Sequence, residues 1–211
     1  QGAGTQHLGV TLTNFGVNGV KTLGLANGTI NVTSSDYING TLVKYVYRGF
    51  AHMLAAAEPK PRVAVVQVGI NDVWFPGGTG PTRAVADAKE YASVLYSQFV
   101  QPAAQLGIKL VLASVTVIGE KKPGTNPLDK TLDSFQAAMR QVASEASVPF
   151  VDLRAAYIAY ETRVNATSSR HQSTWPHAGI LTYDGVHPTE DGDKMLVAQH
   201  AAGILKALTL H

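Results

Sequence analysis

The chain has no cysteine, few charged residues and no long apolar run. The absence of cysteine excludes a disulfide scaffold, a thiolate zinc site and a cysteine nucleophile. Charged residues make up only 15% of the sequence, the net charge is +2, and the longest basic run is Lys121–Lys122. This pattern argues against a nucleic-acid-binding protein. No stretch approaches the roughly 20 apolar residues of a membrane-spanning helix, so we expect no membrane span.

Hydrophobic residues make up 45% of the 211 residues, which is enough for a buried core in a single domain over residues 1–211. Apolar or alternating runs at residues 10–15, 63–68, 108–117 and 149–153 predict β-strands. Helical periodicity lies between them, at residues 41–57, 84–106, 128–146 and 190–208. Strands separated by crossover helices predict an α/β fold, with a parallel sheet covered by helices on both faces.

Functional residues in such a sheet gather at the carboxyl ends of the strands, where the sequence places three polar loops that contain glycine. The loop at residues 183–188 contains Asp184 and His187, three positions apart. A carboxylate at this spacing can hold one imidazole nitrogen, as the orienting acid of a hydrolase does. The alternative is a simple helix-entry loop, in which Asp184 forms a turn and His187 lies on the surface.

The other two loops are the segment 14–19, which ends at Gly19, and the Gly-x-Asn-Asp turn at residues 69–72. The side-chain amide of Asn71 is a candidate hydrogen-bond donor to a developing oxyanion. Alternatively, Asn71 and Asp72 simply make an Asx turn or cap a helix. A backbone N–H at Gly19 can approach a ligand closely, because glycine has no side chain, although turns also favour glycine.

Taken in this order, the three motifs resemble those of the SGNH (GDSL-type) hydrolase family of esterases and acylhydrolases. The strongest matches are Gly69-Ile70-Asn71-Asp72 and Asp184-Gly185-Val186-His187-Pro188, and the resemblance runs from about Val10 to the C-terminus. It implies a three-layer α/β/α sandwich around a flavodoxin-like parallel sheet. By position, it also implies that Gly19 and Asn71 form the oxyanion hole, that His187 is the general base and that Asp184 orients it.

The resemblance further implies acyl transfer in two steps without a metal or organic cofactor. A serine hydroxyl attacks the ester as His187 takes its proton, and water then releases the acyl group. The family acts on short-chain, lipid and sugar esters, so we expect a small-molecule, glycan or lipid ester as substrate. Trp74 and Phe75 either line an acyl pocket or pack within their loop.

One motif of the family, the Gly-Asp-Ser that carries its nucleophile, is absent from the chain. Thr5 is the only hydroxyl residue before Val10, and it lies too close to the next strand to replace that serine. The other serines are expected in a polar loop, a buried strand, a helix surface or a polar insertion: Ser34, Ser35, Ser114, Ser134, Ser168, Ser169 and Ser173. We therefore expect the first strand, the first helix and the nucleophilic serine on a preceding segment or a separate chain.

Two other functions compete with the esterase. In a catalytically inactive SGNH-like protein, the same fold would bind a glycan, a lipid or a protein. Retention of Asn71, Asp184 and His187 favours the enzyme, because a binding protein has no physical need for all three. A flavodoxin-like nucleotide binder is disfavoured, because the sequence has neither a Gly-x-Gly-x-x-Gly nor a P-loop motif.

The sequence also contains four Asn-x-Ser/Thr motifs, and their number favours a secreted glycoprotein over a chance cluster in polar loops. The acceptors are Asn27, Asn31, Asn39 and Asn165. Six further histidines have no ligand-like spacing and are expected at the surface or at helix caps: His7, His52, His171, His177, His200 and His211.

Overall fold

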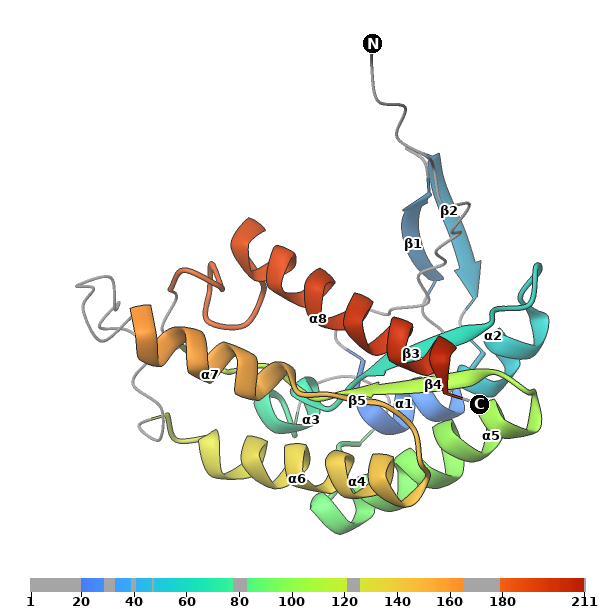
Figure 1. The fold of residues 1–211 in the computed structure, drawn as a ribbon, viewed down its shortest axis with the longest axis horizontal. Helices are drawn as coiled ribbons and strands as arrows, with labels where there is room; N and C mark the ends of the chain where they lie inside the picture. Colours follow the sequence, from blue (N-terminus) through green and yellow to red (C-terminus); the bar gives the residue numbers. More distant parts are fainter. Residues whose placement is uncertain are drawn as a thin grey trace.

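The computed structural model describes residues 20–28, 33–38, 41–46, 48–77, 83–120, 126–164 and 179–210 (Figure 1). For residues 33–38, 41–46 and Val164 it describes the backbone alone. The strand expected at residues 10–15 and the turn that ends at Gly19 lie outside these residues.

A parallel sheet lies at the centre of the fold. It contains β3 (Val63–Gln67), β4 (Lys109–Ala113) and β5 (Phe150–Val151), in the order β3-β4-β5. Val65 pairs with Val111, and Leu112 pairs with Phe150. All three strands lie where the sequence predicts them, although β4 and β5 are shorter than the apolar runs that contain them.

Helices cover both faces of this sheet. On one face lies α8 (Glu190–Thr209), which contacts all three strands, and on the other lie α5 (Gln101–Gln105) and α6 (Asp129–Glu145) (Figure 1). Leu110 and Leu112 belong to the main hydrophobic core, whereas Val111 and Ala113 pack in a second cluster with Ala207 of α8. Successive residues of a strand point to opposite faces, so the apolar run of β4 serves both layers. The predicted α/β class is confirmed.

Among the helices, α6 and α8 match the predicted ranges closely. In α6, the side chains of Leu132, Phe135, Met139 and Val142 are buried at intervals of three or four residues. In α8, Gly203 allows close packing on the sheet, because a Cβ at this position would clash with Val151. None of the described helices combines the length and apolar character that crossing a membrane requires.

The helix predicted at residues 41–57 is wrong in its first half. Residues Thr41–Val46 form β2, which pairs antiparallel with β1 (Thr33–Ile38), and only Phe50–Ala56 form a helix, α2. Threonine, valine and tyrosine are frequent in the 41–46 segment, and these residues favour strands over helices. Ser34 and Ser35 consequently lie in β1 and not in the loop that we expected.

The helix predicted at residues 84–106 is present but irregular. It contains α4 (Ala88–Leu95), the π-helical segment η1 (Tyr96–Val100) and α5. Pro102 lies in the first turn of α5, just after the π-helical segment. Proline has no N–H, and its ring clashes with the carbonyl one turn earlier, so the wider turn accommodates it.

Three further helices have no counterpart in the sequence prediction. They are the short helices α1 (Thr22–Asn27) and α3 (Ile70–Trp74), and the longer α7 (Leu153–Val164). The first two have only six and five residues, too few for a periodic pattern to stand out. The first residue of α7, Leu153, belongs to the apolar run at residues 149–153, which we expected to form the last strand.

Candidate active site

The Gly-x-Asn-Asp turn connects the end of β3 to α3. Gly69 has a φ of 114°, in the region that glycine alone adopts readily, and a Cβ there would lie 2.9 Å from the Tyr91 hydroxyl. That hydroxyl is buried and donates to the Val68 carbonyl at 2.6 Å. Burial, with a smaller effect of Asp72, raises the pKa of Tyr91 well above its ordinary value. Tyr91 therefore stays a neutral donor that fixes the turn.

Asn71 and Asp72 hold the segment that directly follows Gly19. The amide nitrogen of Asn71 donates to the Val20 carbonyl at 2.9 Å. The buried carboxylate of Asp72 accepts from the Thr22 N–H at 2.8 Å, from the Thr22 hydroxyl at 2.7 Å and from the Val85 N–H at 3.0 Å. Asn71 therefore makes a contact 51 residues away in the chain. Gly19 itself lies outside the described residues, so its role stays a prediction.

Asp184 and His187 form a hydrogen-bonded pair in the loop before α8. His187 Nδ1 lies 2.6 Å from Asp184 Oδ2. Asp184 Oδ1 accepts from the backbone N–H groups of Val186 at 3.0 Å and His187 at 2.8 Å. Burial raises the pKa of Asp184, but the hydrogen bonds from the His187 ring and these N–H groups outweigh it and lower the pKa overall.

The pair is accessible from outside the protein. The side chain of His187 is 53% exposed and that of Asp184 is 38% exposed. With Nδ1 engaged by the carboxylate, the ring has its second nitrogen, Nε2, for a reacting group. An imidazole that is oriented from one side and open on the other is suited to proton transfer.

Aromatic side chains connect the histidine loop, defined here as residues 179–189, to the helix of Asn71. The ring centroid of Trp74 lies 6.3 Å from that of His187. Trp74 follows Asn71 by three positions in α3, so the two share one side of this helix. Tyr183 stacks on His187 with centroids 5.7 Å apart, and Phe75 stacks on Trp74 at 4.9 Å. The structure thus places the Asp184–His187 pair beside the helix that carries Asn71.

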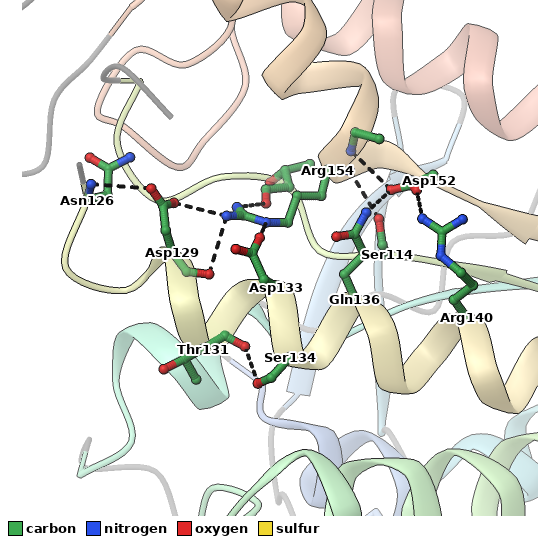
Figure 2. Close-up of polar contacts among 12 residues, drawn as sticks. Ser114, Asn126, Asp129, Thr131, Asp133, Ser134, Gln136, Arg140, Asp152 and Arg154 are labelled. Atoms are coloured by element: carbon green, nitrogen blue, oxygen red, sulfur yellow. Dashed lines mark hydrogen bonds and ion pairs between the residues drawn. The ribbon is translucent and has the colours of Figure 1, made fainter. Parts of the chain in front are cut away.

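Among the described serines with a predicted position, Ser134 lies on a helix surface as expected. Ser114 is buried as expected but lies just beyond the end of β4, and Ser34 and Ser35 lie in β1. Ser134 is exposed on α6, where its hydroxyl donates to the Thr131 carbonyl at 2.7 Å (Figure 2). Ser114 is completely buried after β4 and accepts from the Arg154 N–H at 3.1 Å. Ser168, Ser169 and Ser173 lie outside the described residues.

Several contributors to the site were missed in the sequence. Asp72 was considered only as part of a local Asx turn or helix cap, and Tyr183, just before the Asp184–Pro188 motif, was given no role. Asp72 had a usable signal, because an aspartate that follows a buried strand often accepts from nearby backbone N–H groups. The stacking of Tyr183 on His187 had none, because it depends on how the loop folds back on itself.

The remaining predicted positions are only partly described. Asn27 is exposed at the last position of α1, whereas Asn31, Asn39 and Asn165 lie outside the described residues, so glycosylation stays a prediction. His52 is exposed as expected. His200 is not a surface residue: it is partly buried in α8, its Nε2 is buried, and burial lowers the pKa of its ring. His7, His171, His177 and His211 also lie outside the described residues.

Comparisons with known proteins agree with the fold and the motifs. The model of the GDSL-like lipase/acylhydrolase family matches residues 5–195. The crystal structure of an acetyl xylan esterase, AlAXEase, is 27% identical to this chain and has a TM-score of 0.60, over 72% of this chain and 71% of that one. No match was found among curated proteins.

Two further solved structures share the fold at lower identity. A variant of Axe2, an acetyl-xylooligosaccharide esterase from Geobacillus stearothermophilus, is 24% identical, with a TM-score of 0.53 over 76% of this chain and 72% of that one. LAE5, an α/β hydrolase enzyme from the metagenome of Lake Arreo in Spain, is 21% identical, with a TM-score of 0.53 over 72% and 65%. Because the family model covers most of the sequence, this chain belongs to the GDSL-like lipase/acylhydrolase family and is an SGNH-type ester hydrolase.

Proposed function

We propose that the protein hydrolyses carboxylic esters through an acyl-enzyme, with a serine nucleophile supplied by a preceding segment or a separate chain. In this proposal His187 is the general base, Asp184 orients it, and Asn71 and the Gly19 N–H bind the oxyanion. The observation that carries it is the position of the Asp184–His187 pair beside the helix of Asn71.

In the first step the serine oxygen attacks the ester carbonyl carbon, and Nε2 of His187 takes the hydroxyl proton. The carboxylate of Asp184 stabilises the imidazolium that forms. The C=O π electrons move to the carbonyl oxygen, which becomes an oxyanion. An amide nitrogen carries two N–H groups, so Asn71 can donate one to Val20 and the other to this oxyanion.

The tetrahedral intermediate then collapses. The bond between the acyl carbon and the alcohol oxygen breaks, and the alcohol leaves with the proton held on Nε2, so an acyl-serine remains. Water repeats the sequence: it loses a proton to His187, attacks the acyl carbon and releases the carboxylic acid. The serine recovers its proton, and the enzyme is regenerated.

The second edge of β3, which pairs with no described strand, supports the proposal that the nucleophile comes on another segment. Among the described residues β3 pairs only with β4. Val65, on the face of the sheet that α8 packs against, is 36% exposed, so this face is not fully covered beside β3. An added parallel strand at this edge would satisfy the β3 backbone. Its carboxyl end would lie next to the Gly-x-Asn-Asp turn, where a serine can reach His187.

For the substrate, we propose a short acyl ester of a saccharide. Its support is the similarity to AlAXEase, an acetyl xylan esterase, together with two exposed aromatic rings near His187. Phe75 is 52% exposed and Tyr183 is 64% exposed. Ligand sites are commonly lined by aromatic side chains, so we propose that these two rings contact the substrate. Release of acetate from acetylated xylooligosaccharides, compared with release of longer acyl chains from the same sugars, tests this choice.

A fluorophosphonate probe applied to the complete protein tests the mechanism. We expect labelling of one serine outside α6, mapped by peptide mass spectrometry, and loss of this labelling in His187→Ala. The matched control is Ser134→Ala, which removes an exposed serine and should leave labelling unchanged. Absence of labelling in the folded complete protein would instead favour the catalytically inactive binding protein. Labelling of Ser134 would assign the nucleophile to α6.

We also propose that the protein is secreted and glycosylated, because the exposed Asn27 begins an Asn-Gly-Thr motif. Protein secreted by its native host should lose mass on treatment with peptide N-glycosidase. An Asn27→Gln variant should carry one glycan less. An unchanged mass in both experiments contradicts the proposal.

A further inference from the structure

A buried glutamate after β4 contacts the base of the histidine loop. The side chain of Glu120 is completely buried. One carboxylate oxygen, Oε2, accepts from the Ile180 N–H at 3.0 Å. The other, Oε1, accepts from the Thr182 hydroxyl at 2.7 Å and also from the Thr182 N–H. Glu120 therefore binds a loop that lies some 60 residues further along the chain.

Glu120 needs these hydrogen bonds, because its carboxyl group has no contact with water. A completely buried carboxylate is unfavourable unless several hydrogen bonds replace its hydration. The contact also leaves no room for a side chain at residue 179, because a Cβ on Gly179 would clash with Glu120 Oε2. Any movement of the loop base would leave a buried carboxyl group without its hydrogen-bond donors. The position of the Ile180–Thr182 segment is therefore tightly fixed.

The fixed base determines where the reactive part of the loop lies. Thr189 N–H donates to the Leu181 carbonyl at 2.8 Å, and Tyr183 N–H donates to the His187 carbonyl at 3.0 Å. These two bonds close the loop on itself around Asp184. A third bond joins the tip of the loop to the residue before Glu120: Gly119 N–H donates to the Gly185 carbonyl at 2.6 Å.

The Gly119–Glu120 turn is itself held by a polar network. The Asn126 amide donates to the Gly119 carbonyl at 2.8 Å. The Asn126 N–H donates to Asp129 at 3.3 Å (Figure 2). Asp129 in turn forms a buried ion pair with Arg154 at 3.0 Å. The network thus connects the histidine loop, through the turn, to residues at the starts of α6 and α7.

We propose that Glu120 is a positioning residue for catalysis, which holds the histidine loop so that Asp184 and His187 stay aligned with Asn71. The proposal rests on the esterase function proposed above. Glu120 does not touch the substrate in this scheme. It acts through the backbone of Ile180 and Thr182, and its removal would displace His187 without removing any reacting group.

Kinetics of the complete protein on a short acyl ester test this role. We expect Glu120→Ala to lower kcat by about 10²-fold with little change in KM, because a misplaced base slows chemistry more than it weakens substrate binding. Glu120→Gln keeps one acceptor oxygen, so a smaller loss of about 10-fold is expected. Thr182→Val removes a single hydroxyl donor and should have the smallest effect of the three.

The matched control is Asp152→Asn. Asp152 is also a carboxylate with several donors, including the Ala155 N–H and Gln136 (Figure 2), but none of its described partners belongs to the histidine loop. This variant should keep the kcat of the wild type. Circular dichroism and thermal unfolding identify variants that are folded at the assay temperature, and Glu120→Gln and Thr182→Val provide the test if Glu120→Ala does not fold.

A second measurement does not depend on hydrolysis. Ring ¹⁵N chemical shifts of His187 report which nitrogen carries the proton, and Asp184 selects Nδ1–H in the wild type. We expect mixed tautomers in the Glu120 variants and the wild-type tautomer in Asp152→Asn. If the wild type hydrolyses no ester but the tautomer still changes, the proposed function fails and the positioning role stands. Wild-type kcat and tautomer in folded Glu120→Gln and Thr182→Val would overturn the positioning role.

Discussion

The Gly-x-Asn-Asp turn is largely buried and is joined to distant segments by hydrogen bonds. The histidine loop, by contrast, exposes the side chains of Asp184 and His187, and Glu120 binds the backbone at its base. Asp72 is 4% exposed and accepts three hydrogen bonds. The side chain of Asp184, by contrast, is 38% exposed. In the proposed mechanism an oxyanion donor such as Asn71 must stay in place, whereas an acid–base group such as His187 must be reachable. The hydrogen bonds of the Asn71–Asp72 turn and the exposure of the Asp184–His187 pair fit these two proposed roles.

The comparison predicts opposite results for the two aspartates, and the largest effect on activity is expected for Asp184→Asn. Asparagine keeps an oxygen for the N–H groups of Val186 and His187 but presents an amide N–H to the ring, which selects the wrong tautomer. We expect kcat to fall by about 10⁴-fold. The free energy of unfolding should fall by less than it does for Asp72→Asn, because Asp184 is more exposed and asparagine keeps an acceptor for the two N–H groups. Steady-state kinetics and urea unfolding measure the two quantities. A stability loss as large as that of Asp72→Asn would show that the two aspartates do not differ in the way proposed here.

The next effect is expected for Asn71→Ala, which removes the proposed oxyanion donor. We expect a loss of about 10²–10³-fold in kcat, the range seen when a single donor of this kind is removed. Because the substitution also removes the contact with Val20, unfolding must be measured alongside the kinetics. A change in KM alone would show that Asn71 binds the substrate and does not stabilise the transition state.

A stability loss is expected for Asp72→Asn in the buried turn. One amide oxygen cannot replace two carboxylate oxygens, so at least one of the buried N–H groups of Thr22 and Val85 loses its acceptor. We expect the free energy of unfolding to fall by about 1.5–3 kcal/mol. The midpoint of urea unfolding measures this loss. The folded fraction should keep a kcat within about 10-fold of the wild type, and a loss comparable to that of Asp184→Asn would contradict the division of roles.

The last prediction concerns the pH dependence of stability and a second buried carboxyl near the base of the histidine loop. Burial, and then the neighbouring Glu120, raises the pKa of Glu161 from 4.5 to about 8, against an opposing effect of Arg154 and a further raising effect of Asp129. The folded state therefore holds a proton that the unfolded state has lost. Stability from this group should fall by about 1.4 kcal/mol per pH unit from about pH 5 to pH 8 and then level off.

Glu161→Gln removes this titration and provides the comparison. Because glutamine resembles the protonated glutamate, the variant should match the wild type near pH 5 and become increasingly more stable than it towards pH 8. Urea unfolding of both proteins across this range measures the difference. A constant difference at all pH values would show that Glu161 does not titrate in the folded protein between these limits.

Local patterns in the sequence predicted the contact between Asp184 and His187 and the place of Asn71 after β3, whereas the roles of these residues stay predictions. Asp184 and His187 are three positions apart, so their contact needed only one turn of chain, and Asn71 follows an apolar strand at the functional edge of the sheet. The contact of Glu120 with Thr182 spans 62 residues and leaves no periodic pattern. The burial of Arg154 likewise depends on the convergence of α6 and α7. Contacts of this kind arise from packing, and the sequence alone did not reveal them.

The same reasoning explains the main error in the fold. Residues 41–57 contain apolar positions that satisfy helical spacing, but the strand preference of residues 41–46 was given too little weight. A hairpin partner at residues 33–38 decided the outcome. The strands of the parallel sheet were easier to predict, because each is a short continuous apolar run between helices.

The π-helical segment Tyr96–Val100 has a consequence for chain length. A π-helical turn holds one residue more than an α-helical turn, so it resembles a single-residue insertion within a helix. Deleting one residue there should produce a regular helix and leave Tyr91 and Ala103 facing the core as before. The same deletion within α6 would rotate every later side chain by about 100° and turn buried positions towards solvent. Natural length variation in this protein should therefore concentrate at residues 96–100.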